Sequence, residues 1–182
     1  MKGLKKLTAL YWAQLHLREA RALCDLATWL PKEHRNVDVF FGLWTGVIVA
    51  YARSFTQNKG VSAIDAKFRC FGSQRDQVLH DQLIGMRHHL HAHKDRSWEE
   101  QVAAKLSKPN FVSKVYVTVL SDGETEWEVQ RPTFHEKHFS DVKQLCVVQV
   151  NRLKEESDKM LKSFLEAHNV TPGKYDLETD FP

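Results

Sequence analysis

The sequence predicts a mainly α-helical protein, an up-and-down four-helix bundle with a short β-hairpin inserted before the last long helix. Four stretches of the chain place apolar side chains at every third or fourth position, which is the spacing of one helix face. One short region between the third and fourth stretches alternates between branched apolar and polar residues, as a strand does. The 182 residues suffice for one domain with a sizeable core, so we expect a single domain over residues 1–168.

The first two helices are predicted from their apolar patterns and their ends. Residues 4–30 form the first helix, and Pro31 ends it. Residues 37–56 are apolar nearly all round, so this helix is expected at the centre of the bundle, with Asn36 or Asp38 as its cap. The apolar line of the first helix comprises Leu10, Ala13, Leu17, Ala20, Cys24 and Ala27.

The remaining helices follow from the same signals. A short helix is expected over residues 62–68, and Ser73 is a good cap for a third long helix over residues 74–93. Residues 169–182 are acidic and are expected to form a loosely held C-terminal tail. The last helix covers residues 136–168, with a seam of roughly 3.5-residue spacing that comprises Phe139, Val142, Cys146, Leu153, Met160 and Phe164.

Residues 114–130 are predicted to form the β-hairpin. Val115, Val117 and Val119 alternate with other residues, and a second alternating stretch follows a turn signal centred on Gly123. Because two strands alone are only marginally stable, we expect the hairpin to pack against the helices.

Charge and cysteine content restrict the class of protein. The formal net charge of +3 permits an RNA partner, although a strongly basic nucleic-acid binder would show a larger excess. Cys24 and Cys146 fall on apolar helix positions, where buried free thiols are usual, so a reducing cytoplasm is the simplest compartment. The most apolar segment, residues 37–52, is too short to span a membrane, and the N-terminus lacks a signal-peptide pattern.

The most unusual composition occurs in residues 86–95. Four of the ten histidines lie within six residues there, preceded by Arg87 and followed by Asp95. A metal site is one interpretation, because His89 and His93 are four apart and share a helix face, with His80, Asp81 or Asp95 as a possible third ligand. No glutamate follows His89 and no cysteine is near, so metal binding ranks second and no cofactor is expected.

Acid–base chemistry on a phosphodiester is the first interpretation. Histidine has the pKa for proton transfer near neutral pH, and arginine has the planar charge that matches phosphate oxygens. Arg87 and His93 supply these groups, but on a straight helix they point about 120° apart and lie ~9 Å apart along the axis. A kinked helix end, or two copies meeting at a twofold axis, would bring them together. Histidines at a helix C-terminus can also simply complement its dipole, and His88 and His91 taken alone favour that explanation.

The run Arg87-His88, Leu90, Ala92-His93 and Asp95 resembles the motif of the HEPN superfamily of helical nucleotide-binding domains. Residues 51–55, at the end of the second helix, and the late hairpin followed by a long helix resemble its abortive-infection-like branch. The resemblance implies a homodimeric, metal-independent ribonuclease of toxin or antiviral type, with RNA as substrate and a possible antitoxin partner. Carried onto this chain, it implies that Arg87 steadies the phosphate and His93 transfers the proton, with His88 in the polar slot between them.

Three further residues are candidates for substrate contacts. Arg53 could face the cleft as a second phosphate contact, but capping its helix or pairing with Asp76 or Asp81 is the preferred explanation. His91 and Asp95 belong to the same stretch as the catalytic candidates. The alternative functions are a non-catalytic HEPN-like module that binds nucleotide or protein and, ranked lower, a metal-binding helical bundle.

Overall fold

The protein is mainly helical, with a two-stranded antiparallel hairpin before its last long helix. The computed structural model describes residues 2–56, 63–88, 114–121, 123–130, 136–168, 170 and 173. The four described α-helices and the two strands are α1 (Lys2–Trp29), α2 (Val37–Arg53), α3 (Gln74–Met86), β1 (Lys114–Val119), β2 (Thr125–Gln130) and α5 (Glu136–His168). The predicted end of the third helix, residues 89–93, and most of the predicted tail, residues 169–182, lie outside the described residues.

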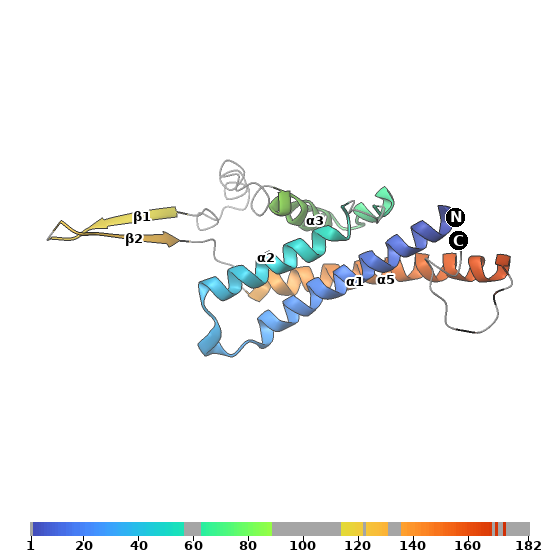
Figure 1. The fold of residues 1–182 in the computed structure, drawn as a ribbon, viewed down its shortest axis with the longest axis horizontal. Helices are drawn as coiled ribbons and strands as arrows, with labels where there is room; N and C mark the ends of the chain where they lie inside the picture. Colours follow the sequence, from blue (N-terminus) through green and yellow to red (C-terminus); the bar gives the residue numbers. More distant parts are fainter. Residues whose placement is uncertain are drawn as a thin grey trace.

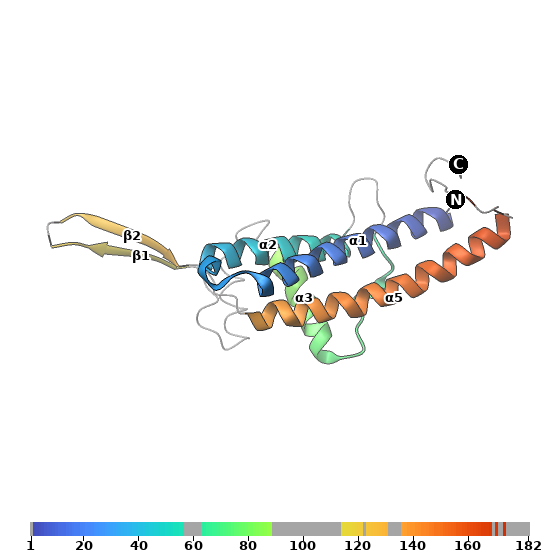
Figure 2. The same cartoon turned by 90° about the horizontal axis from the view of Figure 1, so that it is seen from below.

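Three long helices run side by side, and α3 lies across them. In Figure 1, α1 and α5 follow the long axis in opposite directions, and α2 returns beside α1 after the short 3₁₀ turn η1 (Lys32–His34). Figure 2 shows α3 crossing near α5 at a steep angle instead of running along it. The four predicted long helices are therefore present, although α2 ends at Arg53 and not at residue 56. The regular arrangement of a four-helix bundle stays a prediction.

The contact between α1 and α5 forms the largest part of the core. All members of the predicted apolar line of α1 are buried, and three of them are alanines. Alanine side chains let two helix backbones approach closely, which explains why long helices pack along this line. The antiparallel direction is visible in the pairs that meet, since Gln14 donates to Ser157 Oγ at 3.1 Å while Lys143 pairs with Asp25 at 2.5 Å.

The start of α2 is fixed by a side-chain cap and by aromatic packing. Asn36 accepts a hydrogen bond from Val39 N at 2.9 Å, which confirms the predicted N-cap and satisfies a backbone donor that the helix leaves unpaired. One turn further, Phe40 meets Phe139 of α5 in a tilted arrangement, with 5.7 Å between ring centroids. This contact joins the beginning of α2 to the beginning of α5.

The predicted short helix over residues 62–68 is wrong in type. The chain forms the 3₁₀ turn η2 (Ala66–Arg69) instead, and Asp65, the residue before this turn, pairs with Lys6 at 2.7 Å. A buried amide explains why the segment stays a tight turn. Gln149 of α5 donates from Nε2 to the carbonyl of Phe68 at 2.6 Å, and Phe68 inserts into the core.

Replacing Gln149 by leucine is expected to lower the free energy of unfolding by about 1–3 kcal/mol, because the buried carbonyl of Phe68 loses its donor. Arg152 also loses its contact to Gln149 Oε1, at 2.9 Å. Urea unfolding measures the difference. Gln144→Leu is the matched control, since this amide lies exposed on the same helix and its loss should change stability by less than about 0.5 kcal/mol. Equal stability of the two variants would show that Gln149 does not hold η2.

The hairpin has the predicted strands but not the predicted packing. Six residue pairs join the strands, from Lys114 with Gln130 to Val119 with Thr125, and Gly123 provides the turn with φ at +84°. The hairpin extends beyond the ends of the helices (Figures 1 and 2), and Tyr116, Val117 and Val119 are exposed. The expectation that it packs against the helices is therefore wrong, and its strands are held mainly by each other.

Candidate functional site

The helix that carries the histidine-rich stretch begins at a side-chain cap and leads directly into that stretch. Ser73 Oγ accepts from Asp76 N at 3.3 Å, as predicted, and α3 then runs to Met86. The backbone continues through Arg87 and His88 as a wider, π-type turn. Such widened turns occur often at functional sites, because they change the direction of the side chains that follow.

His80 fixes the position of α3 on the core. Its ring is 3% exposed, and Nδ1 lies 2.9 Å from the hydroxyl oxygen of Tyr51 on α2. Phe55 and Phe71 enclose the imidazole, with centroid separations of 4.6 and 5.0 Å. From the sequence, His80 is considered only as a possible third metal ligand, and its burial is not predicted. The signal that could have predicted this burial is the spacing of His80 to Leu83 and Met86, the other two buried residues of the helix, because residues three positions apart share a helix face.

Burial determines the protonation of this pair. It lowers the pKa of His80 to about 4, while Asp81 opposes this shift and Arg69 adds to it. Burial also raises the pKa of Tyr51 well above its ordinary value, and the charges of Asp76 and Asp81 act in the same direction. Both side chains are therefore neutral near pH 7, and the phenol can donate its hydrogen to the Nδ1 lone pair.

Arg87 lies one heptad after His80 and projects from nearly the same side of α3. Seven residues correspond to almost two full turns, so the two positions are separated by about 10 Å along the axis. Arg87 is half-buried, and its Nη1 atom lies 3.4 Å from Nδ1 of the exposed His88. Because a guanidinium can only donate, this contact requires an unprotonated Nδ1 on His88.

The other predicted site residues are distributed as follows. Arg53 lies exposed in the last turn of α2, so its predicted role as a phosphate contact stays a prediction. Four further candidates lie outside the described residues, namely His89, His91, His93 and Asp95. The expected approach of His93 to Arg87 therefore stays a prediction. Among the residues that the structure describes, no three side chains of His, Cys, Asp or Glu are grouped to hold a metal ion.

The basic residues near this region serve mainly as structural contacts. Lys67 pairs with Glu156 of α5 at 2.8 Å, and Arg69 donates to the carbonyl of Phe55 at 2.7 Å. Each of these contacts connects η2 to a neighbouring helix. They stabilise the surroundings of α3 and leave Arg87 as the better candidate for an anion contact.

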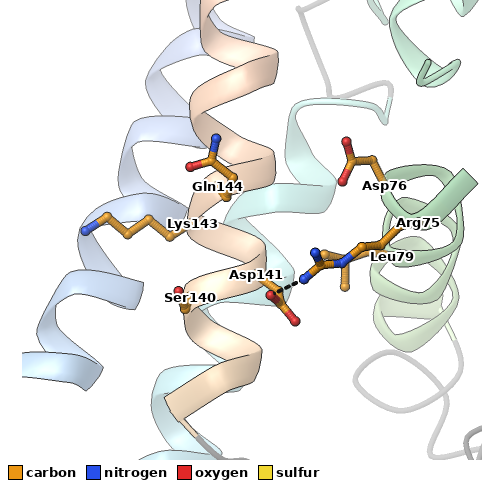
Figure 3. A pocket seen from close by; sticks show the side chains of 7 residues that line it. All are labelled: Arg75, Asp76, Leu79, Ser140, Asp141, Lys143 and Gln144. Atoms are coloured by element: carbon orange, nitrogen blue, oxygen red, sulfur yellow. Dashed lines mark hydrogen bonds and ion pairs between the residues drawn. The ribbon is translucent and has the colours of Figure 1, made fainter. Parts of the chain in front are cut away.

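A polar cavity of about 380 Å³ lies between the first turns of α3 and α5 (Figure 3). Arg75 reaches across it to Asp141 at 2.5 Å, while Lys143 points away toward α1, where it pairs with Asp25. Arg75 precedes Arg87 by twelve residues, or about 18 Å of helix. The cavity is therefore separate from the end of α3 that carries the histidine-rich stretch, and both of its basic side chains are already in ion pairs.

Comparison of the chain with models of protein families, with curated proteins and with solved structures finds no match. Membership of the HEPN superfamily therefore stays a prediction from the sequence. Among the helices that the structure describes, none has both the length and the apolar content needed to cross a bilayer.

Proposed function

We propose that this protein is a HEPN-type, metal-independent endoribonuclease whose site forms at the C-terminal end of α3. The observation that carries the proposal is the position of Arg87. Its guanidinium lies at a widened helix end, next to an imidazole that accepts from it, at the start of the histidine-rich stretch. A half-buried guanidinium at such a place favours a phosphate ligand, because it offers several donors in one plane.

The chemistry needs only the groups that this stretch supplies. His93 removes the proton from the ribose 2′-hydroxyl, whose oxygen then forms a bond to the adjacent phosphorus. Arg87 stabilises the negative charge of the phosphorane, and the bond from phosphorus to the 5′-oxygen breaks as that oxygen takes up a proton. The products are a 2′,3′-cyclic phosphate and a 5′-hydroxyl. His88 orients Arg87, while His91, Asp95 and Arg53 contact the RNA.

The six-residue spacing of Arg87 and His93 requires a departure from straight helix geometry. The π-type turn at Arg87 and His88 supports such a departure. A homodimer would provide a second route, with one cleft lined by residues of both copies. The proposal also includes a HEPN-like bundle over residues 1–168, completed by the continuation of α3, a cytoplasmic location and an antitoxin protein as a possible partner.

Incubation of the purified chain with structured and unstructured RNA, in EDTA and in added zinc, tests the proposal. We expect EDTA-resistant cleavage and fragments that end in a 2′,3′-cyclic phosphate. Cleavage or folding that disappears on chelation would favour a metal-binding bundle in place of the nuclease. Tight binding of nucleotide or protein without cleavage, under all conditions, would favour a non-catalytic module.

A further inference from the structure

Helix α1 carries a second apolar line on the side that faces away from the core. Trp12 and Leu15 are each 43% exposed, Leu26 is 49% exposed and Trp29 is 82% exposed. The buried line of the same helix, from Leu10 to Ala27, points in nearly the opposite direction. Large apolar side chains that gather along one exposed line mark interaction surfaces in soluble proteins.

The spacing along this outer line is that of a coiled coil. Between Trp12 and Trp29, the positions that share the line alternate by three and four residues, and Glu19 and Ala22 occupy its middle. A regular alternation of three and four is the pattern by which one helix packs against another over several turns. The expected partner of the outer face is therefore another helix.

The order of residues along the line is self-complementary. When the helix is laid antiparallel to a copy of itself about a point between Ala20 and Arg21, Trp12 faces Trp29 of the copy, and Leu15 faces Leu26 of the copy. The third pair joins Glu19 to Ala22 of the copy. Large apolar residues thus meet each other toward both ends, and the only charged residue on the line faces the smallest one.

Charge selects this orientation. A parallel pairing in register would place Glu19 directly against Glu19 of the copy, which is repulsive, whereas the antiparallel pairing offsets the two carboxylates by three residues, about 4.5 Å along the axis, and sets each opposite an alanine. His16 already holds the Glu19 carboxylate at 3.0 Å on one side of the line. On the other side, Arg18 comes within two residues of the level of Asp25 of the copy, so its positive charge approaches a carboxylate that already pairs with Lys143 of its own chain.

We propose that the outer face of α1 pairs antiparallel with α1 of a second copy of this chain. The interface consists of Trp12, Leu15, Ala22, Leu26 and Trp29, with Arg18 and Asp25 at its edge. It uses no residue of α3, so it does not depend on the proposed nuclease function. A chain without ribonuclease activity would still dimerise through α1, and loss of the α1 interface would leave Arg87 and His93 unchanged.

Sedimentation of the full chain and of the variant Leu15→Glu/Leu26→Glu tests the interface. We expect the natural chain to form dimers, and the double variant to raise the dissociation constant at least about 100-fold, because two central apolar contacts per copy are replaced by charges. Val78→Glu is the matched control, since Val78 is 47% exposed on α3 and lies outside the interface. Glu19→Leu should tighten the dimer about 10-fold or more, because it completes the apolar seam.

Cross-linking tests the direction of the pairing. On a Cys70→Ser background, chains with Leu15→Cys and chains with Leu26→Cys should form a disulfide-linked dimer only when they are mixed. In the antiparallel pairing two copies of position 15 lie about 16 Å apart along the axis, too far for a disulfide. A natural chain that remains monomeric, a double variant that dimerises as well as the natural chain, or Leu15→Cys chains that cross-link to themselves would each overturn the proposal.

Discussion

Replacing His93 by alanine is expected to reduce the rate of RNA cleavage by about 10²- to 10⁴-fold, because the 2′-hydroxyl loses the group that takes its proton. Replacing Arg87 by alanine should cause a loss of similar size, about 10²- to 10³-fold, since the charge of the phosphorane is no longer balanced. The double variant should be little worse than the more damaging single variant, because both groups act on one transition state. Single-turnover cleavage of a labelled RNA measures these rates.

Two controls separate chemistry from folding. Arg87→Lys keeps the charge but loses the planar arrangement of donors, so it should recover only part of the rate. The second control is thermal unfolding. Since the buried side chains of Leu83 and Met86 hold α3 in place, the Arg87 and His93 variants should unfold at the same temperature as the natural chain. Full cleavage by either alanine variant would contradict the assignment of these two residues.

The stability of the protein is expected to fall by about 2 kcal/mol between pH 7 and pH 5, because His80 cannot be protonated where it lies. In the unfolded chain this histidine titrates near its ordinary pKa of 6.5, whereas in the folded chain burial lowers its pKa to about 4. The unfolded state therefore takes up a proton first as the pH falls. The contribution of neutral His80 to the free energy of unfolding is therefore fully present above pH 6.5 and is lost progressively between pH 6.5 and pH 4.

Urea unfolding at several pH values between 7 and 5 measures this dependence, in a range where most carboxylates stay ionised. The variant Tyr51→Phe/His80→Leu removes both polar partners together and should have a much flatter pH profile at a small cost in stability. Tyr51→Phe alone should be less stable at every pH while keeping the slope, since His80 stays buried without its hydrogen-bond partner. A double variant with the slope of the natural chain would show that other groups cause the pH dependence.

Much of the framework could be predicted from neighbouring residues in the sequence. The apolar line of α1, the Asn36 and Ser73 caps and the whole extent of α5 are confirmed. These features depend on helix periodicity and on side chains that reach their own backbone within a few positions. The strands of the hairpin are predicted for the same reason, because pairing across a short turn is local.

The errors concern residues whose environment comes from distant parts of the chain. The buried state of His80 depends on Tyr51 of α2 and on Phe55 just after that helix. The tight turn at Phe68 depends on Gln149, eighty-one positions later. When a polar residue lies among apolar ones, the local sequence does not indicate which distant residue will form its hydrogen bond. Arg87 and the histidines that follow were proposed as a site because their composition is unusual in itself, and that proposal stays a prediction.

The sequence by itself determined the type and approximate position of the four long helices and the two strands, and which line of α1 could enter a core. Only the tertiary structure decided that this line meets α5, that the outer line with Trp12 and Trp29 stays exposed, and that the hairpin does not rest on the helices. The physical reason is the range of the interactions involved. Backbone hydrogen bonds and caps act between near neighbours, whereas burial depends on which surfaces of the whole chain come together.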